Sequence, residues 1–225
     1  MIHTILLDVD NTLLDFHACA KQAIAEGFAT FHLPFTGDVF PVFTQVNDVV
    51  WKELEQGVID METLRQTRFQ RVFAALGLTA DGAAFEEYFR ACLKSSHVPV
   101  EGAMELLDGL HGRYDLCVAS NGPYNQQKNR LKQAGMLRYF SQLFISEEIG
   151  FHKPGAEFFA CCLKRLPGVQ KQEILLIGDS LTADMQGGHD FGLQTLWYNH
   201  DRLPVPNPLP AMGVVEQLTD ILKLF

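Results

Sequence analysis

Basic clusters are missing from this 225-residue sequence, in which 18 Lys and Arg residues are outnumbered by 27 Asp and Glu residues. The formal net charge of −9 and the pI of about 5.3 argue against a protein that binds a nucleic-acid polymer, because such proteins present a basic surface to the phosphates. An anionic small molecule would therefore have to be attracted locally, by a metal ion, by one or two lysines or by helix N-termini.

Long apolar runs and paired cysteines are missing as well. No run approaches the ~18 apolar residues that a membrane-spanning helix needs. The first basic residue is Lys21, and acids precede it at positions 8, 10 and 15, which argues against a signal peptide. The five cysteines are odd in number and show no CxxC spacing, which favours reduced thiols. We therefore expect a cytoplasmic protein without a membrane partner, whereas no feature of the sequence indicates its oligomeric state.

Short, continuous apolar runs are present instead. They are too short for helices, and most do not alternate with polar residues, which is typical of parallel strands that are covered on both faces. Amphipathic stretches of helical length separate them, and this alternation predicts βαβ units and a doubly wound, mostly parallel α/β sheet. The predicted strands are residues 5–9, 116–119, 174–177 and 195–198, with 143–145 as a weaker fifth; the predicted helices are 101–110, 125–134, 156–166 and 182–191.

Residues 16–96 have a different pattern. They contain no convincing strand run but four amphipathic stretches, at 17–31, 39–56, 61–76 and 84–94, which glycines and Pro34 separate. This pattern predicts an all-helical module that is inserted directly after the first strand. Residues 1–15 and 97–225 would then form the α/β core, which fits a chain long enough for one medium domain and a smaller one.

Polar residues follow three of the predicted strands at their carboxyl ends, where open α/β sheets bind their ligands. The first strand ends in Asp8-Val9-Asp10, and residues two apart on a strand point to the same side. Each residue taken singly has an ordinary explanation as a turn former, a helix cap or a surface amine. Their conjunction at one sheet edge is much less expected by chance. The full set is Asp8, Asp10, Ser120-Asn121-Gly122, Lys153 of the loop HKPG, Asp179, and Asp184 one helical turn later.

This combination resembles the haloacid dehalogenase superfamily. The four motifs of that superfamily are matched by DVDNT (8–12), by Ser120 in VASNG, by Lys153 in HKPG and by GDSLTAD (178–184). The resemblance extends over essentially the whole chain, and the helical insert corresponds to the superfamily's first type of cap domain (C1). It implies a Rossmann-like core, phosphatase chemistry through an aspartyl phosphate, and Mg²⁺ as the cofactor.

The resemblance also implies the role of each residue. Asp8 is the expected nucleophile, and Asp10 is the general acid and base that protonates the leaving oxygen and then activates water. The implied Mg²⁺ ligands are the Asp8 carboxylate, the Asp10 main-chain carbonyl and the Asp179 carboxylate, with Asp184 behind them or as an alternative ligand.

The other two motifs are expected to hold the phosphate. Ser120 and the backbone amides of Asn121 and Gly122 would bind the phosphoryl oxygens of the substrate. Lys153 would neutralise charge on both the nucleophile and the phosphate, which stabilises the transition state. Ser120 and Lys153 are thus catalytic as well as phosphate-binding residues.

Three alternative functions would use these residues differently. Dehalogenases attack carbon and do not need the second aspartate, so Asp10 favours phosphoryl chemistry. A phosphomutase shares all four motifs and remains open. A receiver-like signalling module also combines acids, a hydroxyl, a lysine and Mg²⁺, but its phosphorylated aspartate follows the third strand and it needs no helical insert.

The substrate is predicted from weaker signals. Residues 10–16 (DNTLLDF), Gly187-Gly188 and residues 192–199 (GLQTLWYN) resemble the superfamily branch of pyrimidine nucleotide 5′-phosphatases, which borders sialic-acid-9-phosphate phosphatases and sugar phosphatases. We therefore expect a phosphatase of pyrimidine nucleoside 5′-monophosphates, with those two classes as alternatives. Trp197 and Tyr198 are expected to pack in the core. In the insert, aromatic residues should form mainly its own core, with one or two facing the substrate; the candidates are Phe16, Phe40, Phe43, Trp51 and Phe69, with Asn47, Lys52, Arg65 and Arg68 as polar ones.

Overall fold

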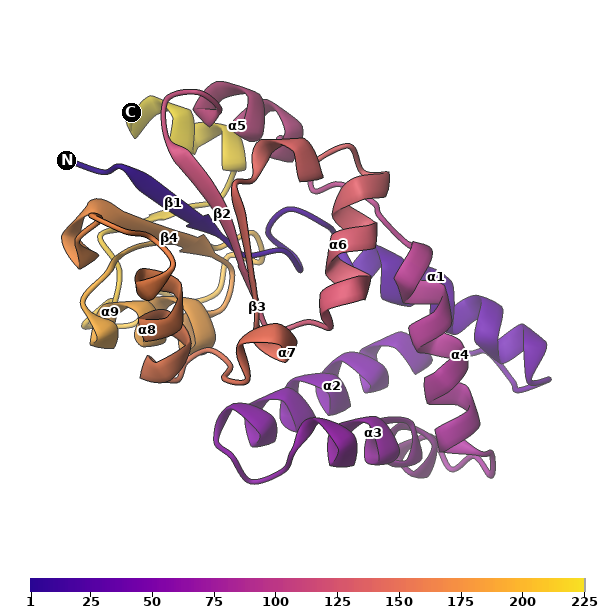
Figure 1. Ribbon diagram of the computed structural model, residues 1–225. Helices are drawn as coiled ribbons and strands as arrows, with labels where there is room; N and C mark the ends of the chain where they lie inside the picture. The colour runs from indigo at the N-terminus through magenta and orange to yellow at the C-terminus, as the bar shows by residue number, and fades with distance from the viewer. Residues whose placement is uncertain (225) are drawn as a thin grey trace. The chain divides into compact units, whose positions relative to one another are not determined.

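The computed structural model describes residues 1–224 and contains a six-stranded sheet of order β3-β2-β1-β4-β5-β6, in which all neighbouring strands are parallel (Figure 1). The predicted doubly wound α/β fold is therefore confirmed. The strands are β1 (Thr4–Leu7), β2 (Asp115–Ser120), β3 (Gln142–Ile145), β4 (Ile174–Gly178), β5 (Gln194–Tyr198) and β6 (Gly213–Val215).

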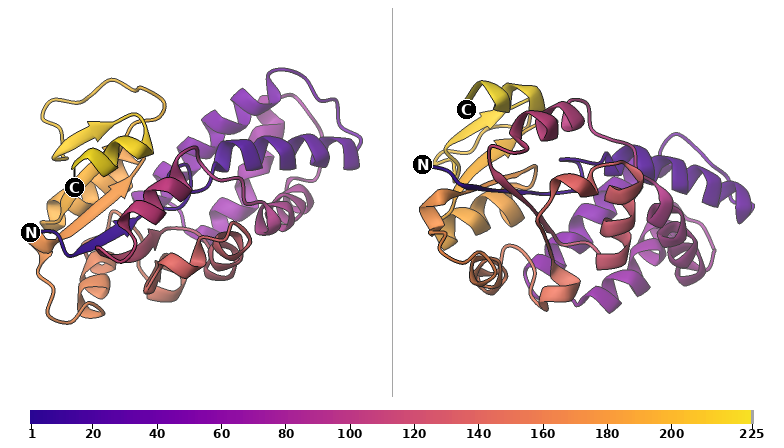
Figure 2. Two further views of the ribbon diagram at one scale, coloured as in Figure 1. Left: turned by 90° about the horizontal axis from the view of Figure 1, so that it is seen from above. Right: turned by 45° about the horizontal axis from the view of Figure 1, so that its top comes forward.

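Helices cover both faces of this sheet, which explains why its strands read as continuous apolar runs. Ile5 and Leu7 of β1 lie in one apolar cluster with α5 (Ala103–Leu110), with Leu131 of α6 (Tyr124–Gln133) and with η4 (Leu218–Leu224). The intervening Leu6 lies in the opposite cluster, with α8 (Ala156–Lys164) and with Phe191 at the end of α9 (Gly187–Phe191). Figure 2 shows α5 and the yellow η4 side by side on the first face.

The first strand is shorter than the sequence predicted. It ends at Leu7, and the chain turns after Asp8: the amides of Leu13 and Leu14 donate to the carbonyl of Val9 at 2.9 and 2.8 Å, and Asn11 has a positive φ of 58°. Asparagine tolerates this left-handed conformation better than most residues. Asp8 is still paired with β4, because its amide donates to the carbonyl of Ile177 at 3.0 Å, whereas a turn, and not the pleat of a strand, sets the direction of the Asp10 side chain.

Two further differences concern short elements. The predicted helix 182–191 is divided into a π-helical segment, η3 (Leu181–Gln186), and α9, so that Asp184 lies on an i→i+5 turn. The edge strand β6 was missed because it has only three residues, all of them partly exposed. Single-turn elements are also too short to leave a periodic signal; they are η1 (Leu137–Tyr139), α7 (Ser146–Ile149) and η2 (Lys171–Glu173).

Residues His17–Ser96 form a second compact unit, separate from the unit that contains Met1–Phe16 and the chain from His97 onward. Its helices are α1 (Phe16–Thr30, which begins one residue earlier), α2 (Val39–Glu55), α3 (Met61–Ala75) and α4 (Gly82–Ser95). Phenylalanines fill its interior: Phe43 and Phe69 are buried and stacked, with ring centroids 5.7 Å apart, and Phe69 also lies 4.6 Å from Phe85. Two of the aromatic residues proposed for substrate stacking thus belong to the core of this unit.

A buried polar cluster lies within the same unit. The Arg68 guanidinium donates to both carboxylate oxygens of Glu86, at 2.7 and 3.1 Å, and to Oδ1 of Asn47 at 3.0 Å. All three residues are buried, and Arg68 also faces the rings of Phe69 and Phe89. Asn47 and Arg68 therefore make contacts inside the helical unit, whereas the other two polar candidates, Lys52 and Arg65, are more exposed.

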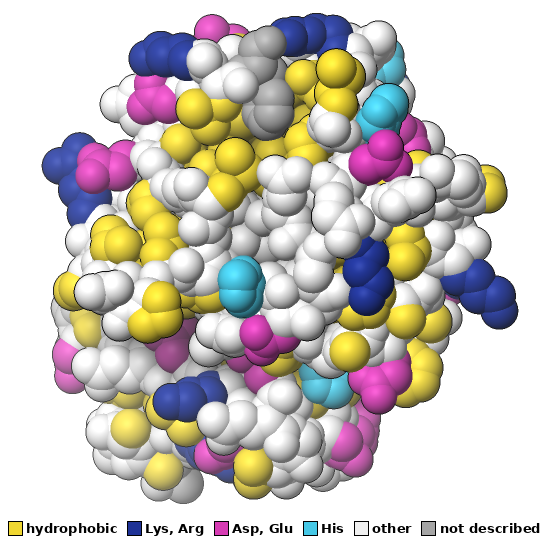
Figure 3. All heavy atoms as spheres, turned by 90° about the vertical axis from the view of Figure 1, so that its left-hand side faces the viewer, with side chains coloured by type: hydrophobic (Ala, Val, Ile, Leu, Met, Phe, Trp, Pro, Cys, Tyr) yellow, Lys and Arg dark blue, Asp and Glu magenta, His cyan; other side chains and the backbone are white. Residues whose placement is uncertain are grey.

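None of the helices within residues 1–224 combines the length and the hydropathy that a membrane span requires. On the face shown in Figure 3, Lys and Arg side chains are dispersed among acidic and uncharged ones.

Candidate active site

Three strand ends bring the predicted residues together in the α/β unit. Asp8 directly follows β1, Ser120 is the last residue of β2, and Asp179 directly follows β4. Because β1 lies between β2 and β4, these residues are neighbours at the carboxyl edge of the sheet. This is also the place where the strand order reverses, at which open α/β sheets bind ligands.

Lys153 is at the centre of this edge. Its Nζ donates to Oδ1 of Asp8 at 2.7 Å, to Oδ1 of Asp184 at 2.5 Å and to the carbonyl of Ala119 at 2.7 Å. An ammonium group has three donors, so all of them are used. Burial lowers the pKa of Lys153, but the carboxylates of Asp184 and Asp8 outweigh this effect and raise the pKa overall. Lys153 is therefore a permanent positive charge in the site.

Asn121 fixes the loop that carries this lysine. Its side-chain amide donates to the carbonyl of Lys153 and accepts from the Lys153 amide, both at 2.8 Å. On the other side, a Cβ on Gly187 would lie 2.7 Å from Pro154, so glycine allows α9 to approach the same loop closely. The sequence predicted Asn121 only for its backbone amide, and the contact of its side chain with Lys153 was missed.

Asp8, Asp179 and Asp184 form a carboxylate cluster in which one oxygen from each lies within 4.8 Å of the others. The backbone carbonyl of Asp179 accepts a hydrogen bond of 2.8 Å from Nε1 of Trp197, which packs in the core as expected. Asp184 fits closely against Gly178: a Cβ there would lie 2.2 Å from its Oδ2. The π-helical turn and this glycine together bring the Asp184 carboxylate close to the two strand-end aspartates.

The electrostatics of the cluster show an excess of negative charge. Burial raises the pKa of Asp8, Lys153 lowers it and Asp184 raises it, with a net result of about 7. Burial, followed by the charges of Asp8 and Asp184, raises the pKa of Asp179 well above its ordinary value. If all three carboxylates are ionised, they exceed the charge of the one ammonium by two, and hard carboxylate oxygens in this arrangement fit a divalent cation such as Mg²⁺.

The side chain of Asp10 has partners that the sequence analysis missed. Its Oδ1 accepts from Nη1 of Arg130 at 2.5 Å, and its Oδ2 accepts from Nε2 of Gln127 at 2.6 Å. The same Gln127 nitrogen also lies 2.9 Å from Oγ of Ser120. Gln127 and Arg130 are both buried on α6, and the available signal was their i, i+3 spacing on a helix that must cover a sheet.

The parallel sheet and the residues at its carboxyl edge define the class of protein. It is a Rossmann-like hydrolase in which the acids and the lysine lie together where the strand order reverses. The chain belongs to the haloacid dehalogenase-like hydrolase family, whose model matches residues 2–192. The resemblance that the four motifs indicated is thus confirmed.

Individual relatives support the same assignment. The HAD-hydrolase YfnB of Bacillus subtilis is 36% identical over 224 residues, which cover 98% of this chain and 95% of that protein. A solved structure of YfnB, described as bound to magnesium, has a TM-score of 0.93 and covers 99% of this chain and 98% of that one. The pyrimidine 5′-nucleotidase PynA of Streptococcus pneumoniae is 38% identical over 200 residues, covering 88% and 84%. The pyrimidine 5′-nucleotidase YjjG of Escherichia coli is 28% identical over 220 residues, covering 98% and 96%. Together these relatives support phosphatase activity.

Proposed function

We propose that this protein is a Mg²⁺-dependent phosphomonoesterase that transfers the phosphoryl group of a small metabolite to Asp8 before water releases it. The observation that carries the proposal is the surplus of negative charge at the sheet edge, where Asp8, Asp179 and Asp184 surround Lys153. Buried and half-buried carboxylates with a raised pKa, close to a cation, are typical of sites that do chemistry.

In the first step, a carboxylate oxygen of Asp8 attacks phosphorus, and the bond from phosphorus to the leaving oxygen breaks. Asp10 must enter this step protonated; it gives its proton to that oxygen, so that the alcohol departs neutral and Asp10 becomes the ionised partner of Arg130. Lys153 remains protonated and donates to Asp8, so its charge lies beside the reacting group throughout. Ser120 and the amides of Asn121 and Gly122 hold the phosphoryl oxygens.

In the second step, water attacks the phosphorus of the aspartyl phosphate. Asp10, now ionised, accepts a proton from the water, and the bond from phosphorus to the Asp8 oxygen breaks. Inorganic phosphate leaves and Asp8 is regenerated. The sum is one ester and one water converted into one alcohol and one phosphate.

The residues present would hold Mg²⁺ through the carboxylates of Asp8 and Asp179 and the main-chain carbonyl of Asp10. Asp184 would lie behind these ligands or serve as an alternative one. When bound, the ion would act as a Lewis acid that neutralises charge on the phosphoryl oxygens.

For the substrate, we propose a pyrimidine nucleoside 5′-monophosphate. The support is the similarity to PynA and YjjG, which are named as pyrimidine 5′-nucleotidases. We further propose that the helical unit His17–Ser96 is the cap that selects the leaving group and excludes water from it.

The reaction class is tested by phosphate release from p-nitrophenyl phosphate. We expect release that requires Mg²⁺, stops with EDTA, and falls by about 10⁴-fold or more in Asp8→Asn, because an amide cannot form the acyl phosphate. Asp190→Asn is the matched control, since Asp190 is exposed in the same unit. Full activity with EDTA or in Asp8→Asn would refute the proposed mechanism.

The substrate is tested separately with a panel of UMP, dUMP and dTMP against purine nucleotides, sugar phosphates and sialic acid 9-phosphate. Pyrimidine nucleotides should have the highest kcat/KM. A flat profile, or a preference for a sugar or sialic acid ester, would overturn the nucleotidase assignment and keep the reaction class. Isomerisation of a sugar phosphate without phosphate release would indicate a phosphomutase.

A further inference from the structure

Two polar side chains are buried where a helix covers the sheet. Gln127 and Arg130 lie one turn apart on α6, are 0% exposed, and flank Leu131, which packs in the sheet cluster. Apolar residues normally occupy such positions. A buried guanidinium is costly unless an opposite charge and hydrogen bonds compensate it, so the partner of Arg130 is the first thing to explain.

That partner is Asp10, and Gln127 completes the arrangement. Arg130 donates from Nη1 to Oδ1 of Asp10 and, at 2.9 Å, to Oε1 of Gln127. This second bond fixes which way the Gln127 amide points, so that its nitrogen faces Oδ2 of Asp10. Both oxygens of the Asp10 carboxylate are therefore held by α6, although Asp10 and Gln127 are 117 residues apart in sequence.

The same amide also orients Ser120. The Ser120 hydroxyl oxygen accepts from Nε2 of Gln127 at 2.9 Å and from the Gly122 amide at 3.2 Å. A serine hydroxyl has two acceptor positions and one donor. With both acceptor positions occupied, the Ser120 hydroxyl is left to act as a donor, which is the form that a phosphoryl oxygen requires.

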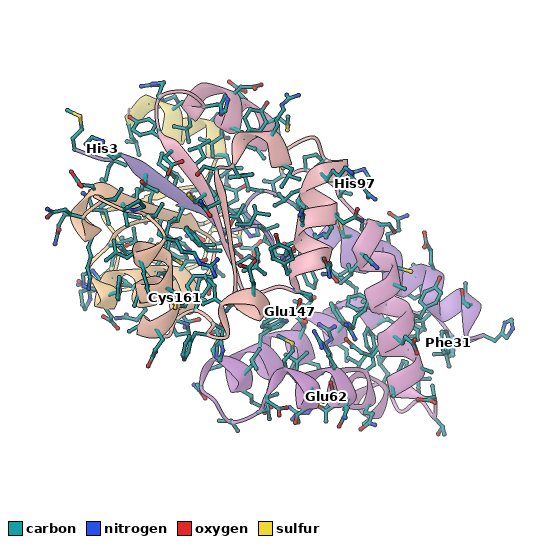
Figure 4. All side chains as sticks on the ribbon, viewed as in Figure 1. His3, Phe31, Glu62, His97, Glu147 and Cys161 are labelled. Carbon is teal, nitrogen blue, oxygen red and sulfur yellow. The ribbon has the colours of Figure 1, made fainter. Side chains whose placement is uncertain are left out.

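The local backbone is shaped around this contact. A Cβ on Gly122 would lie 2.4 Å from Nε2 of Gln127, so only glycine at this position leaves room for the amide. The first turn of α6 is held in place by a hydrogen bond of 2.8 Å from the Tyr124 amide to Oε2 of Glu147, the α7 residue labelled in Figure 4. The helix that carries Gln127 and Arg130 is thus anchored at its N-terminus.

We infer that Gln127 and Arg130 are positioning residues for phosphoryl transfer: they hold the Asp10 carboxylate and turn the Ser120 hydroxyl into a donor. The inference rests on the proposed function, because it gives both residues a role through Asp10 and Ser120. A displacement of an acid or base by about 1 Å can lower a rate by about 100-fold. The loss should be largest where proton donation to the leaving group matters most.

The test compares kcat/KM for two esters of similar shape, p-nitrophenyl phosphate and phenyl phosphate. Nitrophenolate departs without help, whereas phenolate needs the proton that Asp10 supplies. Arg130→Met and Gln127→Ala should each lower kcat/KM for phenyl phosphate by about 100-fold. The loss for p-nitrophenyl phosphate should be smaller by at least about tenfold. Equal losses on both esters, or less than a twofold loss on phenyl phosphate, would overturn the inference.

Lys132→Met is the matched control, because Lys132 is exposed on the same helix, and it should leave both values within twofold of the wild type. In an Asp10→Asn background, adding Arg130→Met should leave the ratio of the two values unchanged; a further change would show that Arg130 does not act through Asp10. If Arg130→Met fails to fold, Gln127→Ala carries the same test. If the wild type hydrolysed neither ester, the proposed function itself would be refuted. That result differs from failure of the inference, in which the wild type is active but the variants do not show the expected losses.

Discussion

Two buried charge clusters, one in each unit of the molecule, differ in their balance. In the helical unit, Arg68 and Glu86 form an ion pair with one charge of each sign, to which Asn47 adds a neutral acceptor. In the α/β unit, Lys153 faces Asp8 and Asp184 directly, and Asp179 lies close by. Lys153 and Arg68 are buried to a similar extent, at 2% and 5% exposed.

The comparison teaches that burial by itself does not mark a site, whereas uncompensated charge does. The helical cluster is neutral, so its charges satisfy each other inside that unit. With its three carboxylates ionised, the sheet-edge cluster would carry two more negative charges than Lys153 can balance, and the raised pKa values of Asp8 and Asp179 express this. A cluster of that kind is costly to fold and is expected where a cation or a phosphoryl group must be handled.

Among variants that break this comparison, the largest effect is expected from removing Lys153, the cation of the sheet-edge cluster. Lys153→Met should lower kcat for p-nitrophenyl phosphate by about 100- to 1,000-fold, because the charge that develops on the phosphoryl group loses its donor. Steady-state phosphate release at saturating substrate measures this effect. Lys164→Met, at an exposed position of the neighbouring helix α8, is the control. A loss below tenfold would place Lys153 outside the chemistry.

Breaking the Arg68–Glu86 ion pair of the helical unit should lower the stability of the protein, whereas Lys153→Met should lower its activity. Arg68→Met leaves the Glu86 carboxylate buried without its cation, and we expect the free energy of unfolding to fall by about 3 kcal/mol or more. The double variant Arg68→Met/Glu86→Met should recover most of this loss, since a neutral, apolar replacement of a whole pair is well tolerated. Urea unfolding followed by circular dichroism measures both. A double variant no more stable than the single one would contradict the ion-pair explanation.

A smaller effect on stability and activity is expected from the close contact between Gly178 and Asp184 in the sheet-edge cluster. Gly178→Ala would place a methyl carbon 2.2 Å from Oδ2 of Asp184, so Asp184 must move away from Lys153. We expect stability to fall by about 2 kcal/mol. Phosphate release should fall as well, by about tenfold. Gly213→Ala is the matched strand control, because its nearest atom lies 3.5 Å away and its backbone needs no special conformation. Thermal unfolding and kcat measurements on both variants decide the matter, and equal behaviour would contradict the steric argument.

The smallest effect concerns the metal-free protein. The pKa of Asp8 is about 7 in the folded chain against an ordinary 3.8, so the folded state binds more protons than the unfolded one between these values. Stability in EDTA should therefore fall as pH rises from 5 to 8, and Tm should change by a few degrees. Mg²⁺ should restore Tm increasingly at higher pH, because the ion replaces the protons.

Asp179→Asn tests directly whether excess negative charge at the sheet edge destabilises the metal-free protein. It removes one surplus charge, so in EDTA at pH 8 it should raise Tm, whereas in the balanced cluster removal of one charge lowers it. Thermal unfolding with EDTA and with Mg²⁺ across pH 5–8 provides the measurement. A Tm in EDTA that rises with pH, or a destabilising Asp179→Asn, would contradict the charge surplus.

Several elements of the fold and site could be predicted because they leave local signals. The apolar runs of β1, β2 and β4 and the polar residues at their carboxyl ends are contiguous in sequence, and Lys153 lies just before the start of α8. Asn121 and Gln127 were missed in their actual contacts because their partners are 32 and 117 residues away. The π-helical turn at Asp184 was also not predictable, since periodicity over six residues does not distinguish it from an α-helix.

By itself, the sequence determined the alternation of strands and helices, the place of the helical insert, and the identity of the acids and the lysine. Hydrophobic periodicity and residue type are local properties that folding does not change. Only the tertiary structure decided that α6 holds Asp10, that Asn121 fixes the Lys153 loop, and that the charges of one cluster balance while those of the other do not. Those outcomes depend on distances between segments far apart in the chain, which are set when the strands pair and the helices pack against them.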